Sequence, residues 1–114
     1  MREAVYTRKY SCASEAAADI FGGKWKVLIL CYLCEAPRRF NELRRLLPEV
    51  TQRMLIRQLR ELEQDGIVHR EIYGTVPPQV TYSLTELGLG LEPIMEQMIV
   101  WGERYLAQDQ ECLE

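Results

Sequence analysis

Residues 51–66 read TQRMLIRQLRELEQDG and contain the clearest structural pattern of the sequence. Leucines at positions 55, 59 and 62 recur at the spacing that places side chains on one face of an α-helix. Arginines at 53, 57 and 60 repeat that spacing shifted by two residues, so at about 100° per residue they lie nearly opposite the leucines. Thr51 is a typical N-cap and Gly66 a typical C-terminal stop. We therefore predict a helix over residues 51–65 with a buried leucine face and an exposed basic face.

Three shorter helices are predicted before this one, over residues 13–21, 24–35 and about 39–47. The first is followed by two glycines at 22 and 23, which are typical after the end of a helix. The other two are followed by prolines at 37 and 48, which cannot continue a helix. The chain therefore reaches the basic helix through a short helix and a tight turn.

After the basic helix the hydrophobic pattern changes to a period of two. Residues 67–73 and 79–84 alternate in this way and predict two strands, and the short segment between them fits only a hairpin. Thr85 then caps a final helix, which we expect to run to about residue 108. We expect a kink at Pro93, because proline has no backbone N–H to donate to the carbonyl of Leu89.

The order of these elements is helix, helix, helix, helix, hairpin, helix, which is typical of a winged helix-turn-helix. We predict a mainly α fold with a small β-hairpin wing (α+β), dimerised through its terminal helices. The length of 114 residues fits one domain over residues 1–114, with its core at about 12–102. The longest apolar run, residues 27–34, is too short to cross a membrane, and the N-terminal residues lack the apolar stretch of a signal peptide. We therefore expect a cytoplasmic protein without membrane contact.

The charge is distributed unevenly along the chain. The net charge is -3, but residues 24–60 carry nine lysines and arginines against three glutamates. From residue 61 onward, eleven acidic residues face two arginines. A basic middle section indicates a polyanionic partner such as double-stranded DNA. The acidic pI of 5.3 favours the alternative, a winged-helix module that binds proteins and no DNA.

An ordered series of motifs resembles the HxlR-type winged-helix regulators, relatives of the MarR-like transcription factors. The matching residues are Cys12, Gly22-Gly23-Lys24-Trp25, Arg39-Phe40-Asn41-Glu42-Leu43, Leu59-Arg60-Glu61-Leu62-Glu63, Asp65-Gly66, Pro77-Pro78, Tyr82-Ser83-Leu84-Thr85, Leu87-Gly88, Pro93 and Trp101-Gly102. The resemblance implies a sequence-specific DNA-binding transcriptional regulator, acting as a homodimer on a near-palindromic operator, with no enzymatic activity and no cofactor. The chain departs from the family pattern at Ala13, at Cys31 and Cys34, and at Gly90.

The candidate DNA-binding residues lie on the basic helix, the residues before it and the wing. Glutamine suits adenine and arginine suits guanine by bidentate geometry, so we expect the N-terminus of the basic helix to read bases. Lys24, Lys26, Arg38 and Arg39 are expected to hold phosphates, which fixes the register of the protein on the duplex. The alternative to DNA binding is that the exposed basic face of this helix is only solvated. For Arg60 we favour pairing with Glu61 or Glu63. The complete candidate set is Lys24, Arg38, Arg39, Thr51, Gln52, Arg53, Arg57, Pro78 and Gln79.

The final helix carries a candidate dimer interface. Its apolar residues, counted from Leu87, step by 4, 3, 4, 3 and 4, as in a coiled-coil seam. The alternative is that this seam covers the domain's own core, which we expect for some of its members. The residues assigned to the interface are Leu91, Ile94, Met98, Trp101 and Tyr105.

The four cysteines and the single histidine offer few chemical sites. Cys12 begins a helix, where free N–H groups favour a thiolate, and in several members of the resembled family a cysteine here senses quinones, aldehydes or oxidants. We therefore hypothesise a sensor at Cys12, with a small-molecule or oxidant inducer; the alternative is a packing cysteine. Cys31 and Cys34 form a C-x-x-C without a second ligand pair, so we expect no metal and keep a dithiol enzyme only as a third hypothesis. We expect Cys112 in a frayed tail and a structural or surface role for His69.

Overall fold

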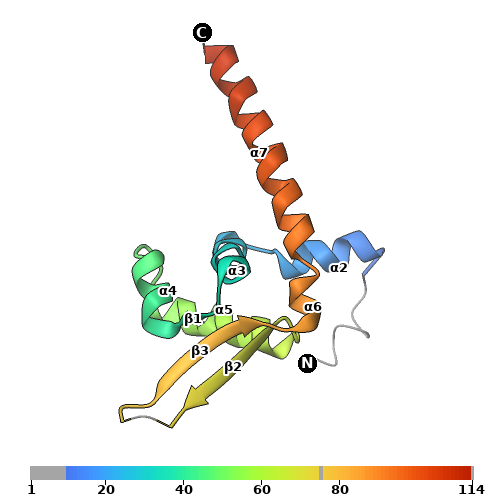
Figure 1. The fold of residues 1–114 in the computed structure, drawn as a ribbon. Coiled ribbons are helices and arrows are strands. Elements are labelled where there is room, and N and C mark those ends of the chain that lie inside the picture. The colour runs from blue at the N-terminus through green and yellow to red at the C-terminus, as the bar shows by residue number, and fades with distance from the viewer. Residues whose placement is uncertain (1–9, 75, 114) are drawn as a thin grey trace.

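The computed structural model describes residues 10–74 and 76–113. Figure 1 shows a helical body, a hairpin that leaves it on one side and a long helix that leaves it on another. The elements are α2 (Ala13–Ile20), α3 (Lys24–Glu35), β1 (Arg38–Arg39), α4 (Phe40–Leu46), α5 (Gln52–Gln64), β2 (Val68–Tyr73), β3 (Gln79–Leu84), α6 (Glu86–Leu89) and α7 (Glu92–Leu113). The prediction of a mainly α fold with a small β wing is confirmed.

Helix α5 forms as its sequence predicts. The Thr51 hydroxyl accepts a hydrogen bond from the backbone N–H of Met54 at 3.1 Å, which satisfies one of the free donors at the helix start. Leu55, Leu59 and Leu62 are fully buried, and together with residues of α3 and α4 they form the centre of the core. Gly66 follows the helix with a φ of 78°, a left-handed conformation that favours glycine.

The sheet has a third strand that the sequence did not predict. The strand order is β1-β3-β2 and both pairs are antiparallel. Tyr82 of the central strand β3 lies opposite Arg38 of β1 and opposite Arg70 of β2. Strand β1 has only two residues, too few to show a period-two pattern, and we expected residue 39 to begin a helix. Its pairing holds the start of α4 against the base of the hairpin, so the wing and the helix-turn-helix are fixed relative to one another.

The prediction of one long final helix with a kink at Pro93 is wrong. The chain forms a short helix, α6, and a separate helix, α7, which begins at Glu92. Pro93 therefore lies in the first turn of α7, where a backbone N–H would have no acceptor within the helix, so proline removes no hydrogen bond there. Gly90 ends α6, and its low helix propensity favours a break at this point.

The break is anchored by contacts between α6 and the turn before β2. The Thr85 hydroxyl accepts a hydrogen bond from Gly88 N–H at 3.0 Å and donates to the carbonyl of Gly66 at 2.6 Å. A Cβ atom at Gly88 would lie 2.2 Å from the carbonyl oxygen of Ile67, so only glycine fits there. After this anchor, α7 buries Met95 against the core and then extends away from the body (Figure 1). Among the described residues, no helix combines the length and apolar character needed to cross a membrane.

Candidate nucleic-acid interface

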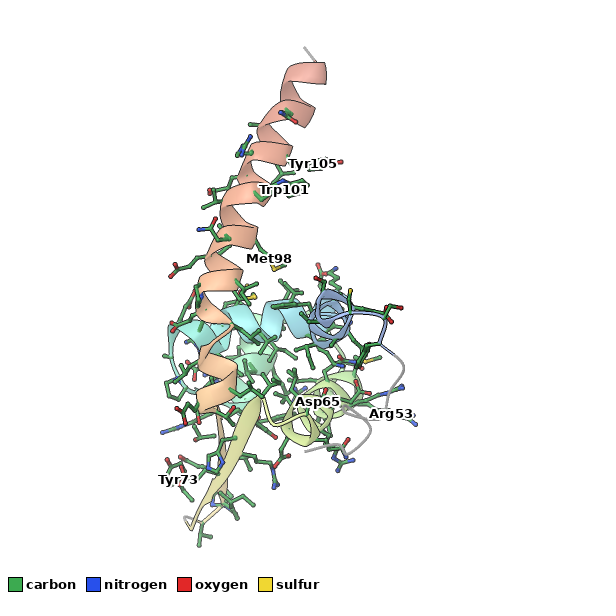
Figure 2. All side chains as sticks on the ribbon, turned by 90° about the vertical axis from the view of Figure 1, so that its right-hand side faces the viewer. Arg53, Asp65, Tyr73, Met98, Trp101 and Tyr105 are labelled. Carbon is green, nitrogen blue, oxygen red and sulfur yellow. The ribbon has the colours of Figure 1, made fainter. Side chains whose placement is uncertain are left out.

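The N-terminal end of α5 is an exposed polar tip. Thr51, Gln52 and Arg53 are all exposed, and Figure 2 shows Arg53 pointing away from the body. Arg57 and Arg60 are also exposed, on the side of α5 opposite its buried leucines. The free N–H groups of a helix start add partial positive charge to this tip. The arrangement therefore offers hydrogen-bonding side chains and positive charge at one end of a firmly packed helix.

Two of the basic residues expected to clamp phosphates are held inside the fold. The Arg38 guanidinium contacts Glu35 Oε1 at 2.7 Å, Glu42 Oε2 at 3.1 Å and the carbonyl of Tyr32 at 3.2 Å, and its side chain is mostly buried. The ammonium group of Lys26 lies 2.9 Å from Glu61 Oε1, and only 10% of its side chain is exposed. Both residues therefore join helices to one another.

Two other predicted clamps remain accessible. Lys24 keeps 65% of its side chain exposed, although its ammonium group lies 3.6 Å from Glu49 and over the ring of Trp25. Arg39 is exposed, and its backbone N–H donates to Glu42 Oε1 at 3.2 Å. This hydrogen bond and the Arg38 guanidinium lower the pKa of Glu42 below its ordinary value of 4.5. Glu42 is thereby kept ionised at the start of α4, where a carboxylate favours the helix.

The wing presents an apolar tip beside α5. Val76 is 99% exposed and Pro77 and Pro78 are exposed, whereas Gln79 is half-buried where β3 begins. Pairing of Tyr73 with Gln79 closes the hairpin. We expected residues 75–79 to form the tip of the wing, and position 75 lies outside the described residues.

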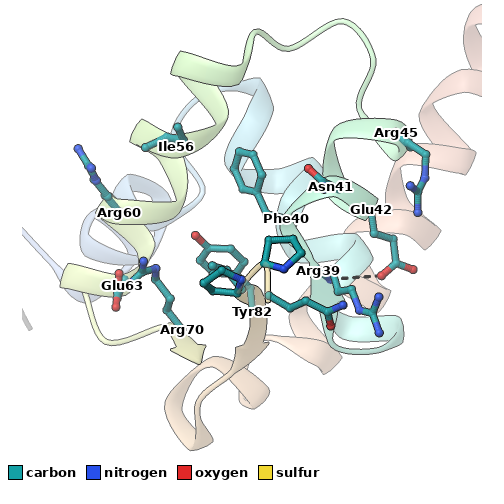
Figure 3. Close-up of a pocket in the computed structure, with 14 residues that line it drawn as sticks. Arg39, Phe40, Asn41, Glu42, Arg45, Ile56, Arg60, Glu63, Arg70 and Tyr82 are labelled. Atoms are coloured by element: carbon teal, nitrogen blue, oxygen red, sulfur yellow. Dashed lines mark hydrogen bonds between the residues drawn. The ribbon is translucent and has the colours of Figure 1, made fainter. Parts of the chain in front are cut away.

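A groove of about 640 Å³ separates α5 from the wing. Figure 3 shows Arg60, Glu63 and Arg70 on one side of it, with Phe40 and Tyr82 at its centre. Arg39, Glu42 and Arg45 lie on the other side (Figure 3). Burial raises the pKa of Tyr82, although the neighbouring Arg70 acts in the opposite direction, so this side chain stays a neutral phenol.

Sequence reasoning missed three arginines of this groove. Arg45 and Arg70 were not among the candidate DNA-binding residues, and for Arg60 we favoured pairing with Glu61 or Glu63. They come from α4, β2 and α5, so no periodicity within one segment reveals that they converge. Only the pairing of β1 with β3, which we did not predict, brings the start of α4 to the hairpin.

Helix α7 exposes much of its apolar surface. Ile94, Met98, Trp101 and Tyr105 of the predicted seam are between 41% and 64% exposed, and Figure 2 shows Met98, Trp101 and Tyr105 on one side of the helix. The rings of Trp101 and Tyr105 stack with centroids 5.6 Å apart. Leu91 is different, because it is half-buried against the domain's own core. Ile99, Val100 and Leu106 are exposed too, on other faces of α7, so the exposed apolar surface of this helix extends beyond the predicted seam.

The cysteines lie in different environments. Cys12 is exposed at the N-cap position of α2, where its side chain makes no capping hydrogen bond. Cys31 and Cys34 are half-buried, and burial is the main cause that raises the pKa of both thiols. The next largest cause is Glu35 of α3 for Cys31 and Glu92 of α7 for Cys34. The part of the chain that the structure describes contains no group of three or more residues able to hold a metal ion. The side chain of Cys112 lies outside the described residues.

A model of one protein family matches residues 20–110, and its description is HxlR-like helix-turn-helix. The chain belongs to the HxlR-like helix-turn-helix family. The resemblance drawn from the motifs is thereby confirmed.

The relatives of the chain in this family are named as transcriptional regulators. The HTH-type transcriptional regulator YybR of Bacillus subtilis (strain 168) is 56% identical over 99 residues, which are 87% of this chain and 79% of YybR. The fold of this chain is similar to that of the redox regulator HypR in its reduced form, with a TM-score of 0.83 and 52% identity over 88% of this chain and 99% of HypR. Diamide-treated YodB from B. subtilis matches with a TM-score of 0.70 and 35% identity over 85% of this chain and 97% of YodB. The chain is a transcriptional regulator of the HxlR-like family and not an enzyme.

Proposed function

We propose that this HxlR-like regulator binds double-stranded DNA with the tip of α5 in the major groove. The observation that carries the proposal is the exposed group Thr51, Gln52 and Arg53 at the start of a helix whose other face is fully buried. In helix-turn-helix proteins the N-terminal residues of the recognition helix contact base edges. Gln52 and Arg53 are the residue types that pair bidentately with adenine and guanine.

We further propose that Arg57, Lys24 and Arg39 contact phosphates and that Pro78 and Gln79 contact the adjacent backbone or minor groove. Arg57 lies on α5, Pro78 and Gln79 lie on the wing, Arg39 lines the groove between them, and Lys24 lies near Glu49 in the turn before α5. All of these residues except Gln79 are exposed. Phosphate contacts fix the register of a protein on the duplex without reading sequence. Arg38 and Lys26 are assigned to the fold, because their cationic groups are already paired with glutamates.

The regulator is proposed to act as a homodimer joined through α7. Support comes from Ile94, Met98, Trp101 and Tyr105, an exposed apolar stripe on a helix that projects beyond the domain. An isologous contact between two such stripes is self-complementary and covers both. Two-fold pairing also presents two α5 tips to two half-sites, about 34 Å apart, on a near-palindromic operator.

Cys12 is proposed as the redox-responsive residue, with an oxidant or electrophile as inducer. Cys12 is exposed at the start of a helix, a position that favours reaction of its sulfur with an oxidant or electrophile. Cys31 and Cys34 are half-buried, and their thiol pKa values are raised. Two solved relatives are described in these terms, HypR as a redox regulator in its reduced form and YodB as diamide-treated.

The DNA-binding proposal is tested by fluorescence anisotropy with a duplex selected from a random library by the protein itself. We expect Arg53→Ala to weaken binding to that site by about 1–3 kcal/mol. Arg44→Ala is the matched control, because Arg44 is exposed on α4 outside the α5 tip and the groove. A protein that selects no sequence and binds no duplex in low-salt buffer does not have the proposed function.

A further inference from the structure

The tip of the wing carries no charged side chain, although it belongs to the surface assigned to DNA. Residues 74–79 read GTVPPQ. Val76 is 99% exposed, and Pro77 and Pro78 are exposed beside it. Phosphate contacts made by lysine and arginine supply much of the attraction between a protein and DNA, and this tip has no cation to make them. Its contact with a duplex therefore depends on apolar side chains.

Apolar side chains continue from the tip along one face of the hairpin. Ile72 of β2 lies opposite Val80 of β3, so the two side chains share a face, and Ile72 is 54% exposed. Tyr82 follows two residues after Val80 on the same face and is buried where the hairpin meets the core. The exposed tip is therefore the end of an apolar ridge that is rooted in the domain. Exposed apolar surface of this kind marks a binding surface.

The length of the hairpin matches the distance between neighbouring grooves of a duplex. Strand β2 has six residues, and its pairing with β3 runs from Val68 opposite Leu84 to Tyr73 opposite Gln79. At about 3.4 Å per residue this ribbon is roughly 20 Å long, and Figure 1 shows it extending beyond the helical body. The nearest minor groove lies half a helical turn, about 17 Å, from the centre of the major groove. With the tip of α5 in the major groove, the wing is long enough to reach that minor groove.

The tip is too wide to lie inside a regular minor groove. The two strands of a hairpin are about 4.8 Å apart before their side chains are counted, whereas the minor groove of regular DNA is about 6 Å wide. Proteins that enter this groove with apolar side chains insert them between neighbouring base pairs, which partly unstacks the pairs and bends the duplex. Proline is among the residues used in this way, and valine is a similarly compact apolar side chain. The exposed Val76 and Pro77 therefore fit the insertion.

We propose that Val76, with Pro77 beside it, enters the minor groove as an apolar wedge, partly unstacks one base step in each half-site and bends the operator. This proposal rests on the proposed function, because it takes DNA binding by α5 as given. Its consequence is a sequence preference at a position where no side chain reads the bases by hydrogen bonds. Pyrimidine–purine steps such as TA unstack most easily, so they should be favoured about half a helical turn from the bases that α5 contacts.

Unstacking and bending are tested with the full chain and the duplex that it selects. The fluorescent base 2-aminopurine, which is quenched by stacking, replaces one adenine at a time. We expect its fluorescence to rise on protein binding at one step of each half-site, outside the bases that α5 contacts. Energy transfer between dyes at the two ends of the duplex measures the bend, and we expect about 20° or more for each wing.

Three variants assign these effects to the wedge. Val76→Ser replaces the apolar side chain by a short polar one and should lose both the bend and the rise in fluorescence, whereas Val76→Leu should keep them. Val100→Ser is the matched control, because it makes the same change at an exposed valine of α7, on a face away from the predicted seam, and should behave as the wild type. Thermal melting of the three variants verifies that they are folded.

A mismatched duplex separates the wedge from a contact made outside the base stack. A mismatched pair at the step located by 2-aminopurine is already partly unstacked, so the wild type no longer supplies the few kcal/mol that unstacking costs. We expect the wild type to bind this duplex about tenfold more tightly than the matched one. The Val76→Ser variant should bind both duplexes equally well.

The outcomes distinguish the wedge from the proposed function. If the wild type binds its duplex with no rise in fluorescence, or if Val76→Ser bends the duplex as the wild type does, the wedge is wrong and the proposed function stands. A Val76→Ser variant that loses affinity but keeps the bend shows a contact with sugars outside the stack, which also overturns the wedge. If Val76→Ser changes no DNA measurement, the tip serves another partner and the proposal is wrong. If the wild type binds no duplex, the proposed function fails and the wedge fails with it.

Discussion

The ammonium group of Lys26 in α3 lies 2.9 Å from the Glu61 carboxylate in α5, and it is buried. Glu61 also faces Arg57 at 3.7 Å on the exposed side of the same helix. One carboxylate therefore links the core-facing helix α3 to a basic residue of the proposed DNA surface. The ion pair joins α5 to α3 in addition to the buried leucines that pack α5 on the core.

Replacing Lys26 by Met should lower the free energy of unfolding by about 2 kcal/mol, because the Glu61 carboxylate loses its buried partner. The expected loss of unfolding free energy is smaller than for a fully buried ion pair, since the Glu61 side chain is 30% exposed and keeps Arg57 nearby. Urea unfolding measures the change. Lys24→Met is the control, because the exposed pair of Lys24 with Glu49 is worth at most about 1 kcal/mol. Equal effects of the two substitutions would contradict a structural role for Lys26.

Replacing Arg38 by Ala should affect stability more than DNA binding. The substitution removes contacts with Glu35 and Glu42 and the hydrogen bond to the Tyr32 carbonyl, so the junction of α3, β1 and α4 loosens. If Arg38 instead holds a phosphate, the slope of log affinity against log salt concentration falls by about one. We expect a lower melting temperature and an unchanged slope.

Replacing Gly88 by Ala should destabilise the fold by about 1–3 kcal/mol or more, because the new methyl group meets the Ile67 carbonyl oxygen at 2.2 Å. Gly74→Ala provides a matched control, since nothing lies within 4 Å of a Cβ atom there. Thermal unfolding of both variants measures the difference. A Gly88→Ala protein as stable as the control would show that α6 does not pack on the turn before β2 as described.

These contacts mark the limit of what the sequence predicts. The arginine face of α5, its Thr51 cap and the two strands of the hairpin follow from local patterns, and the structure confirms them, although burial does not alternate along β2. Strand β1 and the break before Pro93 depend on tertiary contacts, namely the pairing of Arg38 with Tyr82 and the packing of Gly88 on Ile67. The same holds for the burial of Lys26, whose partner lies in another helix. The candidate site was therefore predicted where it lies on one helix and missed where several elements converge.

Alkaline pH should destabilise the protein through Cys31, Cys34 and Tyr82. The pKa of each is raised in the folded state above its ordinary value of 9.0 for the thiols and 10.0 for the phenol. As the pH rises, the unfolded chain therefore loses the thiol and phenol protons before the folded chain does. The contribution of these three groups to the stability of the fold is complete below about pH 9 and is lost as the pH rises above that value. Urea unfolding between pH 7 and 11 tests this. Replacing both cysteines by Ala should reduce the loss between pH 9 and 10; an unchanged pH profile would contradict the assignment.

Iodoacetamide should modify Cys12 faster than Cys31 and Cys34. Cys12 is exposed, whereas the other two thiols are half-buried with raised pKa values and present less thiolate. Mass spectrometry of digested protein after short labelling times separates the three sites. Release of DNA should follow the labelling of Cys12 and be absent in Cys12→Ala. Full release from the Cys12→Ala variant would refute the sensor proposal.

The most direct test of the central claim is the sequence that the purified protein selects from a random DNA library. A homodimer with two α5 tips should enrich a near-palindrome whose half-sites are centred about one helical turn, 10–10.5 base pairs, apart. Arg53→Ala should relax the preference at one position in each half-site. Enrichment of no sequence, or of a site that Arg53→Ala selects equally well, would contradict the account.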